Sequence, residues 1–178
     1  TGLTNILIFF LQESLNWTTK ASSGTLVVVG IIAIIVQGGL IGPLVKQFGE
    51  MRLTLIGSGF ILVACALLIT APKENATINI YSAVSFLAVG AGLITPTLRA
   101  LISKKLDIDK QGSILSNLQG LQSLGGVLGI AMAGRVYDSF GPKSPFIAGS
   151  VILLFMIYLI AEGKSNNSFN NQKSKVLK

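Results

Sequence analysis

Long apolar runs separated by short polar segments dominate this chain. Five of the runs contain no Asp, Glu, Lys or Arg, and each approaches the length that crosses a membrane as a helix. That length is about 20 residues, at roughly 1.5 Å per residue. A shorter apolar segment opens the chain. The pattern predicts an all-α, polytopic membrane helix bundle. The charge-free runs are Ala21–Val45, Leu53–Pro72, Asn75–Leu98, Gln111–Gly134 and Ser144–Ala161.

The runs predict one membrane domain over residues 1–162, and the sequence shows no separate soluble domain. Because the chain opens with Thr1, inside an apolar segment, we expect a piece of a longer protein whose first helix is truncated. Residues 163–178 are rich in Asn, Ser and Lys, which predicts a disordered cytoplasmic tail. The expected helices are a partial one over 1–16, then about 24–45, 53–71, 78–102, 111–135 and 144–161.

Composition supports the membrane rather than water as the solvent. Of the 178 residues, 51% are hydrophobic and 12% are charged, whereas soluble domains carry about 25% charged residues. The formal net charge is +7, which in a soluble protein would suggest a nucleic-acid partner. Here cationic residues that flank membrane helices explain it better. We therefore expect the lipid bilayer, and no nucleic acid, as a partner.

Basic residues are distributed unequally between the two sides that alternating helices define. Ten fall on one side and four on the other, so the positive-inside rule assigns the richer side to the cytoplasm. The cytoplasmic set is Lys46, Arg52, Arg99, Lys104, Lys105, Lys110, Lys164, Lys173, Lys175 and Lys178. The outer set is Lys20, Lys73, Arg135 and Lys143.

The first cytoplasmic hairpin has a specific pattern, G-P-x-x-K-x-x-G-x-x-R, running from Gly42 to Arg52. Gly49 is suited to a positive φ at a helix end, and Gly42 to close helix approach. The hairpin resembles the loop between the second and third helices of each half of major facilitator superfamily transporters. In the family's first half this loop carries an Asp before the Gly. Lys46 and Gln47 stand there in this chain, which favours the second half.

Four further stretches carry the same resemblance and together extend it over most of the chain. They resemble the end of the seventh helix with its outer loop, then the tenth, eleventh and twelfth helices. The resemblance implies the second six-helix half of the fold, closest to the drug:proton antiporter branch that includes tetracycline and multidrug efflux proteins. The stretches are Phe9–Gly24, Val89–Ser103, Lys110–Gly141 and Pro145–Ile160.

The function that this resemblance implies is secondary active transport, namely proton-coupled efflux of small amphipathic or drug-like molecules by alternating access. The implied partners are the N-terminal half of the same transporter, a small-molecule substrate and the proton. The implied location is a multi-pass position in a membrane, the bacterial inner membrane. The alternative is a membrane scaffold or receptor that derives from a half-transporter and does not transport.

Polar residues inside membrane helices tend to face a cavity or a partner, and in the family helices seven, eight, ten and eleven line the cavity. Interhelical hydrogen bonding is the alternative role for each. Asn117 is the favoured substrate contact. The cavity candidates are Asn5, Phe9, Gln12, Gln37, Asn117, Gln119 and Gln122. The candidates for gating or packing are Gly42, Gly49, Arg52, Pro96, Gly120 and Gly126.

Enzyme chemistry, a metal and a cofactor are not expected. The chain has no His, and its single cysteine, Cys65, lies in an apolar run. It also lacks the glycine-rich phosphate loop of an ATP-driven pump. Glu13 is the only carboxylate near a membrane segment that could titrate in transport, and it lies beside the interfacial residue Trp17. We therefore expect the main proton-coupling carboxylate in the N-terminal half.

Overall fold

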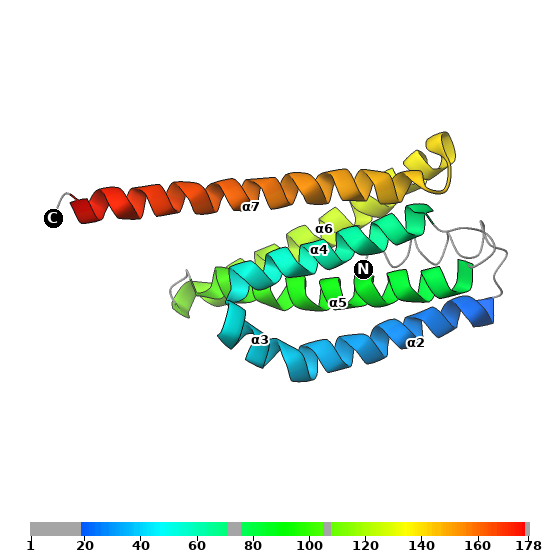
Figure 1. The fold of residues 1–178 in the computed structure, drawn as a ribbon, viewed down its shortest axis with the longest axis horizontal. Helices are drawn as coiled ribbons and strands as arrows, with labels where there is room; N and C mark the ends of the chain where they lie inside the picture. The colour runs from blue at the N-terminus through cyan, green and yellow to red at the C-terminus, as the bar shows by residue number, and fades with distance from the viewer. Residues whose placement is uncertain (1–18, 71–75, 105–107, 177–178) are drawn as a thin grey trace.

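The computed structural model describes residues 19–70, 76–104 and 108–176, and every element in these ranges is helical. Successive long helices run in alternating directions (Figure 1). The α3–α4 junction, the C-terminal end of α5 and the N-terminal end of α6 lie at one end of the bundle. The elements are α2 (Thr19–Ile35), η1 (Val36–Leu40), α3 (Ile41–Phe48), α4 (Glu50–Thr70), α5 (Ala76–Ser103), α6 (Ile108–Phe140) and α7 (Ser144–Val176).

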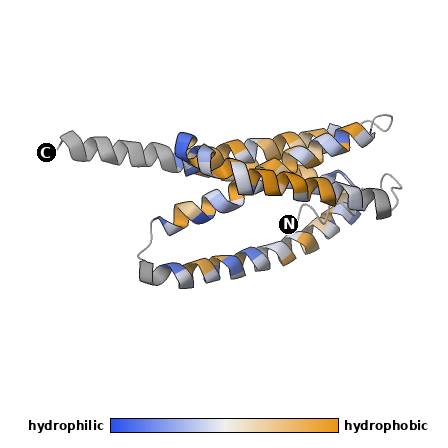
Figure 2. Ribbon diagram, turned by 90° about the horizontal axis from the view of Figure 1, so that it is seen from below, coloured by the Kyte–Doolittle hydropathy of each residue, from blue (hydrophilic) through white to orange (hydrophobic). Residues whose placement is uncertain are grey.

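Three of the described helical segments are long and apolar enough to cross a membrane, and a fourth, Ser144–Ile160, is apolar but shorter. The three are Ser23–Phe48, Glu50–Thr70 and Thr77–Ser103. Helix α6, expected to span over 111–135, is long but does not reach the same apolar composition. Its amides and glycines are the cause. In Figure 2 hydrophilic turns interrupt the hydrophobic ones along this helix, which lies to one side of the bundle.

The first helix that the structure describes has an irregular centre, which the sequence pattern did not predict. One turn, η1, is π-helical and joins α2 to α3, where the rod bends (Figure 1). Ile32, Val36 and Ile41 all pack in one cluster with Leu53 and Leu93. Five positions separate Val36 from Ile41, one more than an α-helical face allows. A π-turn absorbs one extra residue, so it keeps these side chains on one face.

The α3–α4 hairpin ends its first helix at Gly49, which has a φ of 76°. This is the backbone conformation that the sequence predicts there, and glycine adopts it without steric cost. The Gly49 N–H donates to the Val45 carbonyl, 2.9 Å away, which closes the last turn. The chain then re-enters the bundle immediately as α4, beginning at Glu50.

Helices α4 and α5 form the closest pair in the bundle. Gly57 and Gly90 face each other, and a Cβ atom built on Gly90 would lie 2.6 Å from the Gly57 carbonyl oxygen. Small residues permit such approach between membrane helices. The hydroxyls of Thr54 and Thr97 share a buried hydrogen bond of 3.0 Å across the same contact. Toward the other end, Phe146 of α7 is 1% exposed against this pair, in one apolar core.

Helix boundaries differ from the expected ones mainly at the C-terminal end. Helix α7 continues to Val176, through the segment 163–178 for which the sequence predicts a disordered tail. Lys and Gln in this segment are compatible with a helix, although Asn, Ser and Gly weaken it. Helix α6 is also longer at both ends than predicted. The extent of the membrane domain, and the cytoplasmic location of the tail, stay predictions.

Candidate functional site

Helix α5 presents two faces with different roles. Gly90 and Thr97 face α4, as described above. Gly92, Pro96 and Arg99 follow the spacing i, i+4, i+7, which places them on one face of a helix. Ser103 continues that face for another turn. The second face is the one along which the structure gathers predicted cavity residues from other elements.

At Gly92, the N-terminal residue of this face, the π-turn η1 approaches α5. A Cβ atom built on Gly92 would lie 3.2 Å from Cγ1 of Val36 and 3.8 Å from Nε2 of Gln37. Glycine at this position therefore lets η1 come close and brings the Gln37 amide beside α5. Gln37 itself is exposed. The structure thus places one predicted cavity residue directly on this face.

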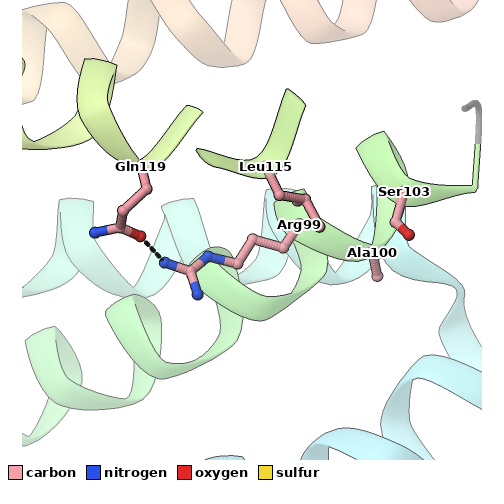
Figure 3. Close-up of a pocket in the computed structure, with 5 residues that line it drawn as sticks. All are labelled: Arg99, Ala100, Ser103, Leu115 and Gln119. Atoms are coloured by element: carbon pink, nitrogen blue, oxygen red, sulfur yellow. Dashed lines mark hydrogen bonds between the residues drawn. The ribbon is translucent and has the colours of Figure 1, made fainter. Parts of the chain in front are cut away.

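Two turns after Gly92 on the same face of α5, helix α6 approaches through polar side chains. Arg99 extends from α5, and its Nη2 donates a hydrogen bond to Oε1 of Gln119 on α6 (Figure 3). One turn nearer the helix end, Nε2 of Gln111 donates to the Ser103 carbonyl oxygen at 3.1 Å. The two bonds fix the relative height of α5 and α6. Between them lies a hollow of about 320 Å³, lined by Arg99, Ala100, Ser103, Leu115 and Gln119.

The amides predicted on α6 do not share one face. Gln119 and Gln122 are three positions apart and therefore neighbours on the helix surface. Asn117 lies two positions before Gln119, about 160° away around a helix that turns about 100° per residue. It lies instead on the side of Leu121 and Leu124, which are 67% and 58% exposed. The three amides therefore do not form one face of α6, and the role of Asn117 as the favoured substrate contact stays a prediction.

An ion pair joins α4 and α5 at the end of the bundle where Arg99 lies. Nζ of Lys104, just past α5, contacts Oε1 of Glu50, the first residue of α4. The Glu50 side chain is 13% exposed and the Lys104 side chain 67%. The Thr54 hydroxyl donates to the Glu50 carbonyl at 2.9 Å. The Glu50 carboxylate therefore pairs with Lys104, whereas the described partner of Arg99 is the neutral amide of Gln119.

The remaining predicted residues are placed as follows. Asn5, Phe9 and Gln12, together with Glu13, lie outside the described residues. Gly42, Gly120 and Gly126 have open space where a Cβ atom would be, and Arg52 is exposed. Their gating or packing role stays a prediction. Pro96 lies inside α5, which continues as a helix through it.

Sequence reasoning counted Arg99 only as a basic charge, and it did not single out Gly57 or Gly92 as site residues. Arg99 could have been found from its place three positions before the end of the predicted helix 78–102, where an arginine must find a partner. A second hollow, of about 470 Å³, lies on α4 and α5 and was not anticipated. It is lined by Phe60, Tyr81, Ser82, Ser85, Phe86 and Val89.

The described helices, three of them long and apolar enough to cross a membrane, are those of a polytopic membrane protein. The family model of the Major Facilitator Superfamily matches residues 1–130, and the chain belongs to that family. This confirms the predicted family, the all-α membrane helix bundle and a multi-pass membrane location, and it agrees with a transport protein rather than an enzyme.

Relatives come from bacteria and mammals. The chain is 26% identical over 130 residues to the tetracycline resistance protein, class C, of Escherichia coli, covering 73% of this chain and 32% of that protein. It is 28% identical over 161 residues to the class G protein of Vibrio anguillarum, covering 86% and 39%. It is 23% identical over 139 residues to hippocampus abundant transcript 1 protein of Homo sapiens, covering 78% and 28%.

The chain spans about a third of the length of the curated relatives it matches. No solved structure matches it. The similarity to tetracycline resistance proteins agrees with the branch that the sequence motifs indicate.

Proposed function

We propose that this chain is the C-terminal half of a secondary active transporter that exports small amphipathic or drug-like molecules. The observation that carries the proposal is the polar face of α5. Gln37 approaches it beside Gly92, and Gln119 approaches it at Arg99. Polar side chains are costly inside a membrane unless they face a partner or a cavity. Their convergence in an otherwise apolar bundle supports a solute pathway there.

The remaining parts of the proposal follow from family membership. The partner is an N-terminal half of the same protein, because the cavity of this fold forms between two halves. The coupling ion is the proton, and its main carboxylate lies in that N-terminal half. The names of the bacterial relatives support drug efflux and the bacterial inner membrane. The α3–α4 hairpin and the end of α5 face the cytoplasm.

Alternating access requires one part of the bundle to move against another. Helices α4 and α5 are held by a backbone approach at Gly57 and Gly90 and by the Thr54–Thr97 bond, and we propose that they move as one body. Helix α6 is joined to α5 through side chains at Arg99 and at Gln111. Such bonds can exchange partners without disturbing a packed core, which makes the α5–α6 contact the place where movement costs least.

The test compares the two sides of α6 in the full-length protein. We expect Gln122→Ala to change the relative export of tetracycline and of a lipophilic cation, measured as accumulation in cells at matched protein abundance. Asn117→Ala, measured in the same way, tests the opposite side of α6, where the sequence analysis placed the favoured substrate contact. Tyr158→Phe, which removes one hydroxyl from an exposed position on α7, is the matched control. If export of both compounds falls only in proportion to protein abundance in all variants, the proposed cavity is refuted.

A further inference from the structure

We propose that the hollow between α5 and α6 binds the phosphate of an anionic membrane lipid through Arg99. The proposal goes beyond transport, because it concerns a lipid and not the exported solute. It starts from Figure 3, in which the Arg99 side chain extends along the hollow toward Gln119. A guanidinium has five N–H donors, and the described contact with Gln119 uses one of them.

The charges at this end of the bundle leave Arg99 without a described counter-ion. Among residues whose side chains the structure describes, the nearby acidic group is Glu50, and Lys104 engages it. Gln119 offers Arg99 an oxygen but no negative charge. A guanidinium matches a phosphate well, because its planar donors can form two parallel bonds to two oxygens. None of the described residues that line the hollow carries a negative charge, and a phosphate would supply one.

The depth of Arg99 selects a lipid as the source of that phosphate. Arg99 lies four positions before Ser103, where α5 and its apolar span both end. At 1.5 Å per residue this is about 6 Å from the end of the helix, and we infer that this places Arg99 at the level of lipid headgroups. Basic pockets between membrane helices on the cytoplasmic side are known to hold anionic headgroups.

The walls of the hollow suit the rest of a lipid molecule. Leu115 and Ala100 provide apolar surface beside Arg99, whereas Gln119 provides a polar rim. The volume, about 320 Å³, is suited to a headgroup with the start of its acyl chains. A free phosphate would fill only a small part of it. In this arrangement the lipid bridges α5 and α6 and adds a charged contact to the Arg99–Gln119 bond.

The experiment titrates the purified full-length protein, in neutral detergent, with dioleoyl phosphatidylglycerol or dioleoyl phosphatidylcholine. Native mass spectrometry gives the dissociation constant of the first bound lipid. We expect a preference for phosphatidylglycerol that Arg99→Gln weakens about tenfold, since a charge-assisted hydrogen-bond pair is lost. Gln119→Glu should weaken it similarly, because it places a carboxylate beside Arg99 that competes with the phosphate.

Arg52→Gln is the matched control, since it removes an exposed basic residue at the same end of the bundle. It should leave the preference unchanged. Equal losses in Arg52→Gln and Arg99→Gln would indicate a diffuse basic surface and overturn the proposal. An unchanged preference in Arg99→Gln would also overturn it, whatever the unfolding temperature of that variant.

A second arm separates lipid phosphate from soluble phosphate. Inorganic phosphate is added to the lipid-free protein, and the unfolding temperature is measured for wild type and Arg99→Gln. We expect no difference in the response of the two proteins. An Arg99-dependent stabilisation by inorganic phosphate, without preference for phosphatidylglycerol, would assign the site to a soluble anion instead. Transport is not a readout in either arm, so failure of the proposed efflux function would leave both results interpretable.

Discussion

Replacing Gly90 by alanine should separate α4 from α5. The added Cβ atom would lie 2.6 Å from the Gly57 carbonyl oxygen, 2.6 Å from Cγ1 of Ile61 and 3.1 Å from the Ile61 nitrogen. Two of these three atoms belong to the backbone of α4, so a change of rotamer cannot relieve the contacts. Ordinary van der Waals contact begins at 3.4 Å. The helices must therefore move apart by 3.4 − 2.6, or about 0.8 Å.

The expected cost is that of an overpacked core, about 1–3 kcal/mol. A change of 1 kcal/mol shifts the unfolding midpoint by roughly 2–4 °C in a domain of this size. We therefore expect Gly90→Ala to lower the midpoint by between about 2 and 12 °C. The separation would also lengthen the Thr54–Thr97 hydrogen bond of the same helix pair. Thr54 lies one turn from Gly57 on α4, and Thr97 lies two turns from Gly90 on α5.

The assay is thermal unfolding of the detergent-purified protein, followed by loss of the monodisperse peak in gel filtration. Gly59→Ala is the control, because it lies on α4 with open space where its Cβ atom would be. Alanine has the higher helix propensity, so this control should be neutral or stabilising. Equal midpoints for Gly90→Ala and Gly59→Ala would refute the close approach.

Three further predictions address other parts of the molecule. A double-mutant cycle of Thr54→Val and Thr97→Val, read by the same unfolding assay, should give a coupling of about 0.5–1 kcal/mol, typical of hydrogen bonds between membrane helices; no coupling would contradict the bond. Single cysteines at Gln47 and Lys143, on a Cys65→Ala background, test the proposed sidedness with an impermeant thiol reagent in intact cells. Lys143→Cys should be labelled and Gln47→Cys should not, and the reverse pattern would invert the topology. Residues 1–178 alone in liposomes should show no proton-gradient-driven flux, and co-expression with the N-terminal half should restore it; robust flux from the fragment would contradict the two-half cavity.

Charge-free runs were sufficient to predict the described helices to within a few residues at most of their ends. Burial in lipid requires every backbone group to be bonded within its own segment, so an apolar run of this length has few alternatives to a helix. This argument does not apply to the part of α7 that follows the apolar segment Ser144–Ile160, because that part is polar. There, helix formation depends on propensities that the sequence pattern did not distinguish from disorder.

The contacts between helices were much harder to predict. The chain has 20 glycines, and nothing in the pattern separates Gly90, which meets a backbone, from Gly120, which has open space around it. The Arg99–Gln119 bond joins residues from different helices, so it depends on how α5 and α6 pack. One feature was within reach of the sequence. Counting about 100° per residue would have separated Asn117 from Gln119 and Gln122.

The π-turn between α2 and α3 bears on how this helix tolerates insertions and deletions. It holds one residue more than an α-helix needs to keep Val36 and Ile41 on the same side. Loss of one residue from the Gly38–Gly39 pair would convert the rod to a regular helix and keep the buried stripe in register. Loss of Gly42 or Pro43 instead would rotate the rest of α3 by about 100° and carry Leu44 and Val45 off the cluster that they pack against. Length variation among relatives in this helix should therefore be confined to the π-turn.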